Sequence, residues 1–479
     1  MTPHDGGDDG VDEVIALVAP QRGEEPRSAP ATGPAPAHAR APTPDSAHAE
    51  PHRATPWPAA RAVAARAGAT VGAAREPLRT PLGQALGQVL AEPLRALTDL
   101  PSFDTSAMDG WAVAGPGPWE IRADGTVLAG HAPAAPLDDG AAVRIATGAR
   151  VPHEATAVIR SEHARTAASG HLHALRGVVQ GQDIRPRGQE CRAGDRLLPA
   201  GTPVTPAVLG LAAAAGYDEL PTRARPRVEV LVLGDELLTA GLPHDGLIRD
   251  ALGPMLAPWL NALGAEVLAT RRIGDDADAL AAAVTGSPAD LVITTGGTAA
   301  GPVDHVHPVL AKAGATLLVD GVKVRPGHPM LLARLDADRH LVGLPGNPLA
   351  AVSGLLTLAE PLLRALAGAP EAPDAPPYRV PVADEVQGHP YDTRLVPVVH
   401  RGDGVVPLRY HGPAMLRGIA AADGMAVVPP GGARPGDALE IIDLPWPGSW
   451  PGPWPGTYGH APADTQARKE GVSRETSQP

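Results

Sequence analysis

The sequence predicts a multidomain protein that combines a doubly wound α/β domain with β-rich domains. Residues 228–366 alternate buried-type strands with helices, which is typical of a parallel sheet with right-handed crossovers. Residues 101–184 and about 370–444 contain short apolar runs separated by turns, which indicate two smaller β domains. A chain of 479 residues is also too long for one hydrophobic core.

Composition excludes several classes of protein. The net charge of −13 repels nucleic acid and anionic membrane surfaces, and no run of 18 apolar residues spans a membrane. The single cysteine, Cys191, excludes a disulfide framework and a multi-thiolate zinc site. The first residues are acidic and lack a signal-peptide pattern. We therefore expect a cytoplasmic protein that binds neither nucleic acid nor a membrane.

The two ends of the chain are expected to be irregular. Residues 1–54 are rich in acids, Pro and Ala, which predicts a disordered leader. From Pro445 onward, Trp446, Trp450 and Trp454 recur every four residues within Pro-Gly repeats. This composition predicts a flexible tail, with a polyproline-type partner ligand as the alternative.

Helices and strands follow from periodicity and punctuation. Leu and Val lie at helical spacing over 77–97, which predicts an amphipathic helix. A second helix begins after Thr205 as N-cap and ends before Gly216. In the α/β domain, strands are expected at 228–234, 266–270, 289–297, 317–324 and 340–344, and helices at 254–263, 277–284, 303–313 and 349–366.

Three turns follow strands of this sheet, at the edge where open α/β sheets bind ligands. They are Gly234-Asp235-Glu236, Thr295-Gly296-Gly297-Thr298 and Pro345-Gly346-Asn347-Pro348. Paired glycines let backbone N–H groups approach an anion, and the next helix adds its dipole. The loop from Gly296 to Gly301 is therefore predicted to receive a phosphorylated small ligand.

Two carboxylates are expected beside this phosphate site. Asp235 and Asp304 would offer the hard oxygen ligands that Mg²⁺ requires; the alternative is that Asp304 caps a helix and Asp235 closes a turn. Arg325, flanked by proline in Arg325-Pro326-Gly327-His328-Pro329, suits either an oxyanion pocket or a surface turn. His305 and His307 face different ways on a helix and make poor joint metal ligands.

Further motifs carry a resemblance to a known family. Residues 100–113 form a loop that enters a strand, with Asp104, Ser106 and Asp109 able to bind a ligand. The chain contains LPSFDTSAMDGWAV at 100–113, IATGARVP at 145–152, GDEL at 234–237, TTGGTAAGPVDHV at 294–306, VRPGHP at 324–329 and GLPGNP at 343–348. In this order they resemble the molybdopterin molybdenumtransferase family, which includes MoeA and the gephyrin E domain, over about residues 75–444.

The resemblance implies four domains and an elongated homodimer. The domains are an elongated helical and dimerisation region (55–100 and 185–223), a β-rich domain (101–184), a molybdopterin-binding α/β domain (224–368) and a C-terminal β-barrel (369–444), followed by the tail from 445 to 479. The S-A-M-D-G segment of one subunit would face the α/β site of the other. The implied reaction takes adenylylated molybdopterin and molybdate, uses Mg²⁺ and releases AMP, with a molybdopterin adenylyltransferase as candidate partner.

The resemblance also assigns roles to individual residues. Asp109, Asp235 and Asp304 would be catalytic, and Asp235 and Asp304 would also hold the metal. The substrate-binding set would be Thr147, Gly296, Gly297, Arg325, Pro326, His328, Pro329 and Asn347.

Several positions depart from the family pattern. Leu233 replaces a threonine, Ala299 a serine, Asp250-Ala251-Leu252 an Asp-Ser-Asn, Arg325 and His328 two lysines, Glu190 an aspartate and Pro413 a serine. Arg325 keeps the charge as a planar fork, whereas His328 is charged only in part near neutral pH. Two hypotheses remain open, an active transferase or a diverged paralogue that binds molybdopterin or a partner without efficient turnover. A nucleotidyltransferase would explain the α/β domain alone.

Overall fold

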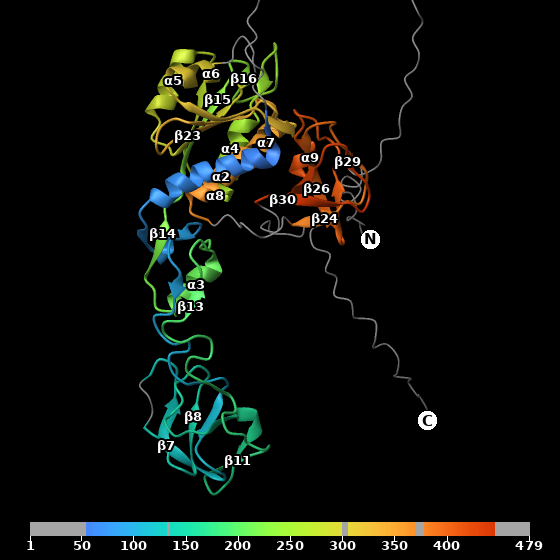
Figure 1. Cartoon of the computed structure of the whole chain (residues 1–479). Helices are drawn as coiled ribbons and strands as arrows, with labels where there is room; N and C mark the ends of the chain where they lie inside the picture. Colours follow the sequence, from blue (N-terminus) through green and yellow to red (C-terminus); the bar gives the residue numbers. More distant parts are fainter. Residues whose placement is uncertain (1–53, 132–134, 299–304, 370–377, 446–479) are drawn as a thin grey trace, which may run out of the picture. The chain divides into compact units, whose positions relative to one another are not determined.

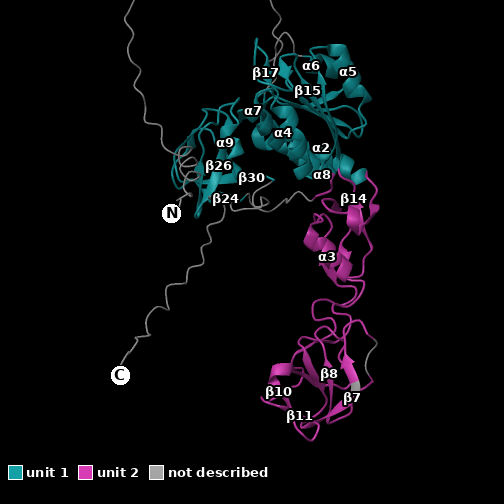
Figure 2. Ribbon diagram, turned by 180° about the vertical axis from the view of Figure 1, so that it is seen from behind, with its two compact units in different colours: residues 1–74, 226–366, 370–479 teal, residues 75–225, 367–369 magenta. Residues whose placement is uncertain are grey.

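The computed structural model describes residues 54–131, 135–298, 305–369 and 378–445. The chain divides into two compact units (Figure 2). One contains the chain up to Ala74 together with Pro226–Leu366 and the part from Pro370, and the other contains Arg75–Arg225 with Ala367–Ala369. The predicted leader, Asp304, Ala299 and the three tail tryptophans lie outside the described residues.

A six-stranded sheet forms the centre of the first unit. Its order is β18 (Glu266–Ile273), β15 (Arg227–Leu233), β19 (Leu291–Thr295), β23 (His340–Leu344), β22 (Leu331–Arg334) and β20 (Thr316–Asp320). The first four strands are parallel, as expected. β22 and β20 are antiparallel, so the parallel pairing predicted from the strand–helix alternation does not extend to this edge. Here the chain turns back directly between strands, without a crossover helix.

The segment 317–324, predicted as one strand, is divided at Gly321. This glycine has φ +76°, and the chain leaves the central sheet after it. β21 (Val322–Arg325) then pairs in parallel with β26 of the C-terminal sheet. The turn that follows Arg325 is thereby held between the α/β domain and the C-terminal strands.

Helices cover both faces of the central sheet, which confirms the doubly wound class. α4 (Leu252–Ala262) packs on one face through Leu256 and Leu260. α5 (Ala277–Gly286) and α6 (Val306–Lys312) pack on the other. Asp276 caps α5 by accepting from the backbone N–H groups of Asp278 and Ala279.

One long apolar helix follows β23 and is buried in the core. It comprises α7 (Pro348–Gly354), a π-helical turn (Leu355–Ala359) and α8 (Glu360–Leu366). It is the only described helix long and apolar enough to cross a membrane, but 89% of its apolar window is buried inside the molecule. Its composition is therefore that of a core helix.

α2 (Trp57–Ala74) runs alongside α8 (Figure 1). The helices approach closely because a Cβ on Gly68 would lie 2.3 Å from the carbonyl oxygen of Leu362. Trp57 Nε1 donates to Thr357 Oγ1 at 3.0 Å, and Arg61 donates to the carbonyl oxygen of Leu356. These bonds satisfy polar groups at the π-helical turn.

The helix predicted at 77–97 is not formed. That segment contains β2 (Leu78–Pro81), a 3₁₀ turn (Leu82–Gln84), β3 (Val89–Leu90) and β4 (Leu94–Arg95). β2 and β3 pair with β14 (Glu219–Arg223), and β4 pairs with β13 (Arg196–Leu198). Three prolines and two glycines interrupt the helical spacing, so Leu90 and Leu94 instead enter a small core with Leu220.

The helix predicted after Thr205 is confirmed as α3 (Pro206–Ala214). Thr205 Oγ1 accepts from Val208 N at 3.3 Å, and Pro206 occupies the first turn. Gly216 follows the end of the helix with φ +101°, the conformation that favours glycine.

The remainder of the second unit is the expected β-rich domain. Its sheet has the order β10 (Ala164–Thr166), β11 (His171–Ala174), β7 (Trp119–Val127), β8 (Ala141–Ile145), β6 (Gly110–Val113) and β9 (Ala157–Arg160). A short 3₁₀ turn (Ser161–His163) links β9 to β10, and β5 (Thr105–Ser106) pairs with β12 (Ile184–Arg185).

The C-terminal part forms a second sheet of the first unit. Its order is β1 (Thr55–Pro56), β21, β26 (Thr393–Arg401), β28 (Gly424–Val428), β30 (Ala438–Asp443) and β24 (Arg379–Pro381), with β27 (Gly404–Pro407) paired to β26. β25 (Val386–Gln387) pairs with β29 (Gly432–Ala433), β16 (Leu237–Leu238) pairs with β17 (Ile248–Arg249), and α9 spans Arg417–Ala420.

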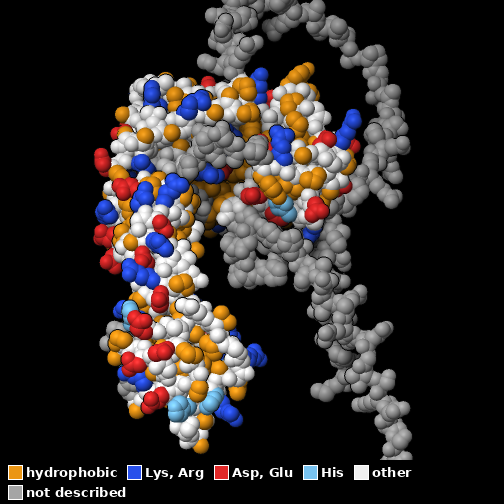
Figure 3. Space-filling model, turned by 60° about the horizontal axis from the view of Figure 1, so that its bottom comes forward, with side chains coloured by type: hydrophobic (Ala, Val, Ile, Leu, Met, Phe, Trp, Pro, Cys, Tyr) orange, Lys and Arg blue, Asp and Glu red, His pale blue; other side chains and the backbone are white. Residues whose placement is uncertain are grey.

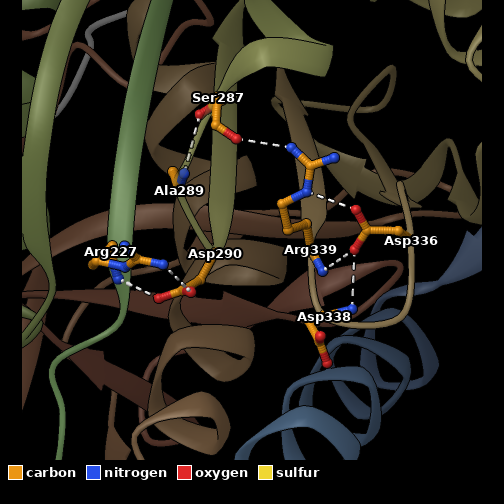
Figure 4. A network of polar contacts seen from close by, with 7 residues as sticks. All are labelled: Arg227, Ser287, Ala289, Asp290, Asp336, Asp338 and Arg339. Carbon is orange, nitrogen blue, oxygen red and sulfur yellow. Dashed lines mark hydrogen bonds and ion pairs between the residues drawn. The ribbon is translucent and has the colours of Figure 1, made fainter.

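A polar network joins the amino ends of the central strands (Figure 4). Asp290 accepts from the backbone N–H of Arg227 at 2.7 Å. Arg339 donates to the carbonyl oxygen of Ser287 at 2.8 Å and to Asp336 at 2.6 Å. This network lies at the opposite edge from the predicted ligand turns. On the surface shown in Figure 3, charges of both signs are interspersed among the described residues.

Candidate active site

The three predicted turns meet at the carboxyl edge of β15, β19 and β23. Gly296 donates its N–H to the carbonyl oxygen of Leu344, the last residue of β23, at 2.8 Å. A Cβ on Gly296 would lie 3.6 Å from the carbonyl oxygen of Leu233, and one on Gly346 would lie 3.7 Å from the Cα of Gly296. The end of β15, just before the first turn, and the third turn therefore both lie next to Gly296.

Gly296 and Gly297 adopt a conformation that other residues rarely do. Their φ angles are +84° and +65°, in the left-handed region where a side chain introduces strain. Because the Gly296 N–H already binds the carbonyl oxygen of Leu344, the N–H of this pair that remains for an anion is that of Gly297. The absence of side chains on both residues lets an anion approach the backbone closely. The described part of this loop ends at Thr298.

The carboxylate of Asp235 is available at this edge. Asp235 and Glu236 are both exposed, and the Asp235 carboxylate forms no hydrogen bond or ion pair with the described part of the chain. Gly274 lies beside it, because a Cβ there would come within 2.6 Å of Asp235 Oδ1. Hard carboxylate oxygens without a competing partner fit a divalent cation. Within the described ranges, no cluster of three metal-ligating side chains occurs.

Arg272 is a residue of this edge that the sequence analysis missed. Its guanidinium donates to the carbonyl oxygens of Gly234 at 3.1 Å and of Asp235 at 3.2 Å. It lies near the end of β18, the strand beside β15. The sequence signal that could have identified it is the pair Arg271-Arg272 directly after the predicted strand 266–270.

Arg325 is bound by the C-terminal part of the chain. Its Nε donates to Asp392 Oδ2 at 2.9 Å; the aspartate side chain is 10% exposed and that of Arg325 is 47% exposed. Gly327, two residues later, packs against α7, since its Cβ would lie 3.0 Å from the carbonyl oxygen of Ala350. The turn is therefore bound by the C-terminal part on one side and by α7 on the other. The alternative of a simple surface turn did not predict these contacts.

His328 is engaged within the same turn. Its Nδ1 lies 2.8 Å from the carbonyl oxygen of Val322. A carbonyl only accepts, so Nδ1 carries a hydrogen and Nε2 is the remaining ring nitrogen. Pro326 is buried and Pro329 is half-buried.

The C-terminal part contributes a further hydrogen-bonded pair, Arg394 and His411. Arg394 is the β26 partner of Arg325 and donates to His411 Nδ1 at 3.1 Å. Burial lowers the pKa of the Arg394 guanidinium. Burial, followed by the charge of Arg394, lowers the pKa of His411, which favours the neutral imidazole that accepts this bond.

The first backbone N–H groups of α7 already have a hydrogen-bond acceptor within the chain. The carbonyl oxygen of Pro413 accepts from Leu349 N at 2.9 Å and from Ala350 N at 3.2 Å. Asn347, the N-cap residue, is exposed and makes no capping bond through its side chain. The Asn347 amide, rather than those two backbone N–H groups, is therefore available to a ligand.

In the β-rich domain, Asp109 and Thr147 form a hydrogen-bonded pair. Asp109 Oδ1 accepts from Thr147 N at 2.7 Å and from Thr147 Oγ1 at 2.9 Å. The backbone bond first, and then the hydroxyl bond, lower the pKa of Asp109. Gly110 beside it is required, because a Cβ would lie 2.0 Å from the carbonyl oxygen of Ile159.

The other two polar residues of this segment have structural partners. Ser106 is fully buried and donates to the carbonyl oxygen of Met108 at 2.6 Å. Asp104 Oδ1 accepts from Arg187 N at 2.6 Å. Asp104 and Asp109 are both exposed, and each uses only one carboxylate oxygen in these bonds. On α6, His307 Nε2 lies 2.9 Å from Asp320 Oδ1, and His305 precedes the helix as its N-cap.

Comparison with known proteins matches all three parts of this architecture. Residues 56–216 match the model of the MoeA N-terminal region (domain I and II). Residues 229–365 match a probable molybdopterin binding domain, and 379–444 match the MoeA C-terminal region (domain IV). The fold and site thus define a MoeA-type protein built around a molybdopterin-binding domain.

Curated relatives and a solved structure extend this match over most of the chain. The molybdopterin molybdenumtransferase of Staphylococcus aureus (strain COL) is 30% identical over 370 residues, which cover 74% of this chain and 87% of the relative. That of Nostoc sp. is 29% identical over 375 residues, covering 74% and 86%. The molybdopterin biosynthesis MoeA protein from Pyrococcus horikosii has a TM-score of 0.64 at 25% identity, covering 82% of this chain and 99% of the other.

The chain belongs to the molybdopterin molybdenumtransferase family. The predicted resemblance and the multidomain α/β plus β fold class are confirmed.

Proposed function

We propose that this protein is a molybdopterin molybdenumtransferase of molybdenum cofactor biosynthesis. It takes adenylylated molybdopterin and molybdate. Water adds across the P–O–P bond between the adenylyl group and the pterin phosphate and releases AMP, and the dithiolene sulfurs replace molybdate oxygen, which leaves as water, as molybdenum is inserted. The observation that carries this proposal is that the end of β15 and the third glycine turn both lie next to Gly296 at one sheet edge, where the Asp235 carboxylate has no partner among the described residues. The names of the curated relatives support the same reaction.

The proposed roles follow the chemistry of each group. The Gly297 N–H binds a phosphate oxygen, Gly296 leaves room for the phosphate beside the backbone, and the Asn347 amide binds the pterin side. Asp235, together with Asp304 from outside the described residues, would hold Mg²⁺, which when bound neutralises phosphate charge. The Arg325 turn receives the oxyanion, with Pro326, His328 and Pro329 shaping its wall.

We also propose that Asp109 acts on the substrate across a homodimer, with Thr147 holding its carboxylate in place. A donated N–H and O–H leave one carboxylate oxygen of Asp109 occupied and the other free. A cytoplasmic location and handover from a molybdopterin adenylyltransferase complete the proposal. Light scattering tests the dimer, and a monomer at working concentration would contradict the shared site.

A second candidate function is ligand binding without efficient turnover. Two observations favour it. Asp392 pairs with Arg325, and the His328 ring is bound to the carbonyl oxygen of Val322. Both side chains that replace the family's lysines therefore already have a partner within the chain. Leu233 and Pro413 also lack the hydroxyl that the family pattern places there.

Reconstitution separates the two candidates. Purified protein is mixed with adenylylated molybdopterin, molybdate and Mg²⁺, and AMP release is followed over time. Mg²⁺-dependent AMP formation with molybdenum retained on the pterin product supports the transferase. Tight binding of adenylylated molybdopterin with no AMP above a protein-free control supports the binding paralogue.

A further inference from the structure

The β-rich domain contains a cavity of about 690 Å³ that no part of the proposed reaction uses. Its walls are the loop 115–118 with Trp119, the start of β9 at Thr156 and Ala157, and residues from the segment 173–180. The volume falls within the range of small-molecule sites.

The cavity lies at the far end of β6 from the proposed catalytic pair. β6 runs from Gly110 to Val113, and its antiparallel register pairs Gly110 with Ile145 and Val113 with Ala142. Asp109 and Thr147 therefore lie beyond one end of these strands, and the loop 115–118 lies beyond the other. Gly115 lies six positions after Asp109, up to roughly 20 Å of extended chain.

One wall of the cavity is apolar. Trp119 is 4% exposed and belongs to the core of the domain, and its Nε1 donates to the carbonyl oxygen of Gly115 at 3.0 Å, so the indole supports this wall from behind. Pro116, Pro118 and Val178 extend this surface. Such a wall suits a flat apolar group.

Three polar side chains of the cavity have no partner among the described residues. Arg176, His173 and Gln180 line it, and none of their side chains forms a hydrogen bond or ion pair with the described part of the chain. The Thr156 hydroxyl donates to the carbonyl oxygen of Val113 at 3.2 Å and is occupied. Each of the three free side chains can donate to an oxygen atom.

The charge of the cavity is positive in an acidic protein. Arg176 is its one charged lining residue, and no Asp or Glu side chain lines it. Asp139 contacts Gly115 from outside the lining set. An unpaired arginine is suited to a carboxylate, sulfonate or phosphate.

From these features we infer that the β-rich domain carries a second ligand site, for a small organic anion with a flat apolar body. Its anionic group meets Arg176, with His173 and Gln180 as further donors, and its body lies on the two prolines and Val178. The site is independent of the molybdenum insertion site and stands whether or not the protein turns over.

A charge-matched pair of probes tests this inference. 1-Naphthoate and the neutral 1-naphthalenemethanol are titrated into the full-length protein and followed by ligand-observed NMR and calorimetry. We expect naphthoate to bind with a Kd near or below about 1 mM, and the neutral compound to bind about tenfold more weakly, because it lacks the charge-assisted bond.

Variants locate the bound probe. Arg176→Gln is expected to weaken naphthoate about tenfold and leave the neutral compound unchanged. Arg165→Gln, an exposed arginine on β10 of the same sheet, is the matched control and should change neither. Ala174→Leu, which fills part of the cavity, should weaken both probes.

Three results would overturn the inference: no naphthoate binding, equal affinity for the two probes, or naphthoate affinity unchanged in Arg176→Gln. AMP release by Arg176→Gln should equal that of the parent protein, since this site is separate from the reaction. Impaired AMP release in a folded Arg176→Gln protein would contradict that separation.

Discussion

Arg325 Nε and Asp392 Oδ2 are 2.9 Å apart, a hydrogen bond that joins positions 67 residues apart in the chain. Asp392 is almost fully enclosed, whereas Arg325 is half-exposed. The carboxylate therefore fixes one edge of the guanidinium and leaves its other N–H groups for an oxyanion. Because β21 pairs with β26 beside this contact, the C-terminal domain sets the position of a cation of the α/β domain.

Asp392→Ala should therefore impair oxyanion binding more than the chemical step. We expect the KM for molybdate to rise about tenfold, because Arg325 loses its orienting bond, while kcat changes less. The free energy of unfolding should fall by about 1 kcal/mol. Asp403→Ala, at an exposed turn of the same domain, is the control. A kcat loss with unchanged molybdate KM would exclude the positioning role.

Asp235→Asn should weaken metal-dependent turnover at low Mg²⁺ without unfolding the protein. The carboxylate makes no bond with the described residues, so stability should change by less than about 0.5 kcal/mol. Mg²⁺ affinity, measured from the Mg²⁺ dependence of AMP release, should weaken by about 100-fold. Glu236→Gln provides the comparison at the neighbouring exposed acid. Full activity of Asp235→Asn at low Mg²⁺ would remove Asp235 from the metal site.

Gly296→Ala should lower both the stability of the protein and its affinity for the ligand, for two different reasons. The Cβ meets only an ordinary contact at 3.6 Å, so the cost arises from the φ of +84° and should be about 1–2 kcal/mol of stability. Ligand affinity should fall further, because the methyl group obstructs the approach of a phosphate to the backbone. Gly286→Ala, at the end of α5 with open space around it, should be neutral or slightly stabilising. Equal ligand affinity in both variants would contradict a phosphate site at Gly296.

Thr147→Val should move the acid limb of activity to higher pH. The pKa of Asp109 is lowered first by the Thr147 backbone N–H and then by its hydroxyl, so the carboxylate remains ionised to lower pH than an ordinary aspartate. Valine removes only the hydroxyl, so the pKa should rise part of the way to its usual value. The ionised form then disappears at a higher pH as the solution is acidified. The pH profile of AMP release and an NMR titration of Asp109 measure the shift, and coincident profiles would refute it.

Local sequence chemistry predicted the helices whose caps and apolar faces agree. Thr205 with Pro206 marked the start of α3, and the buried faces of α4 and α5 matched their periodicity. The helix prediction for 77–97 was wrong because the leucine spacing is also compatible with short strands once prolines interrupt the backbone hydrogen bonds. Tertiary pairing with β14 then decided its conformation.

In the candidate site too, some residues were predictable from local sequence and others were placed by tertiary structure alone. Gly234, Gly296 and Gly346 were predictable, because each follows a strand of recognisable pattern and parallel strands end at one edge. Arg272 and Asp392 were not, because the first acts through backbone carbonyls of another strand and the second belongs to another domain.

The sequence by itself determined the doubly wound domain, the β-rich domains and the position of the glycine turns, since these depend on periodicity and on residues adjacent in the chain. Tertiary structure alone decided that β21 leaves the central sheet for β26, that Pro413 occupies the first N–H groups of α7, and that Asp392 holds Arg325. Each of these contacts joins residues far apart in sequence. Their partners are selected by how whole sheets pack, and no local pattern records that choice.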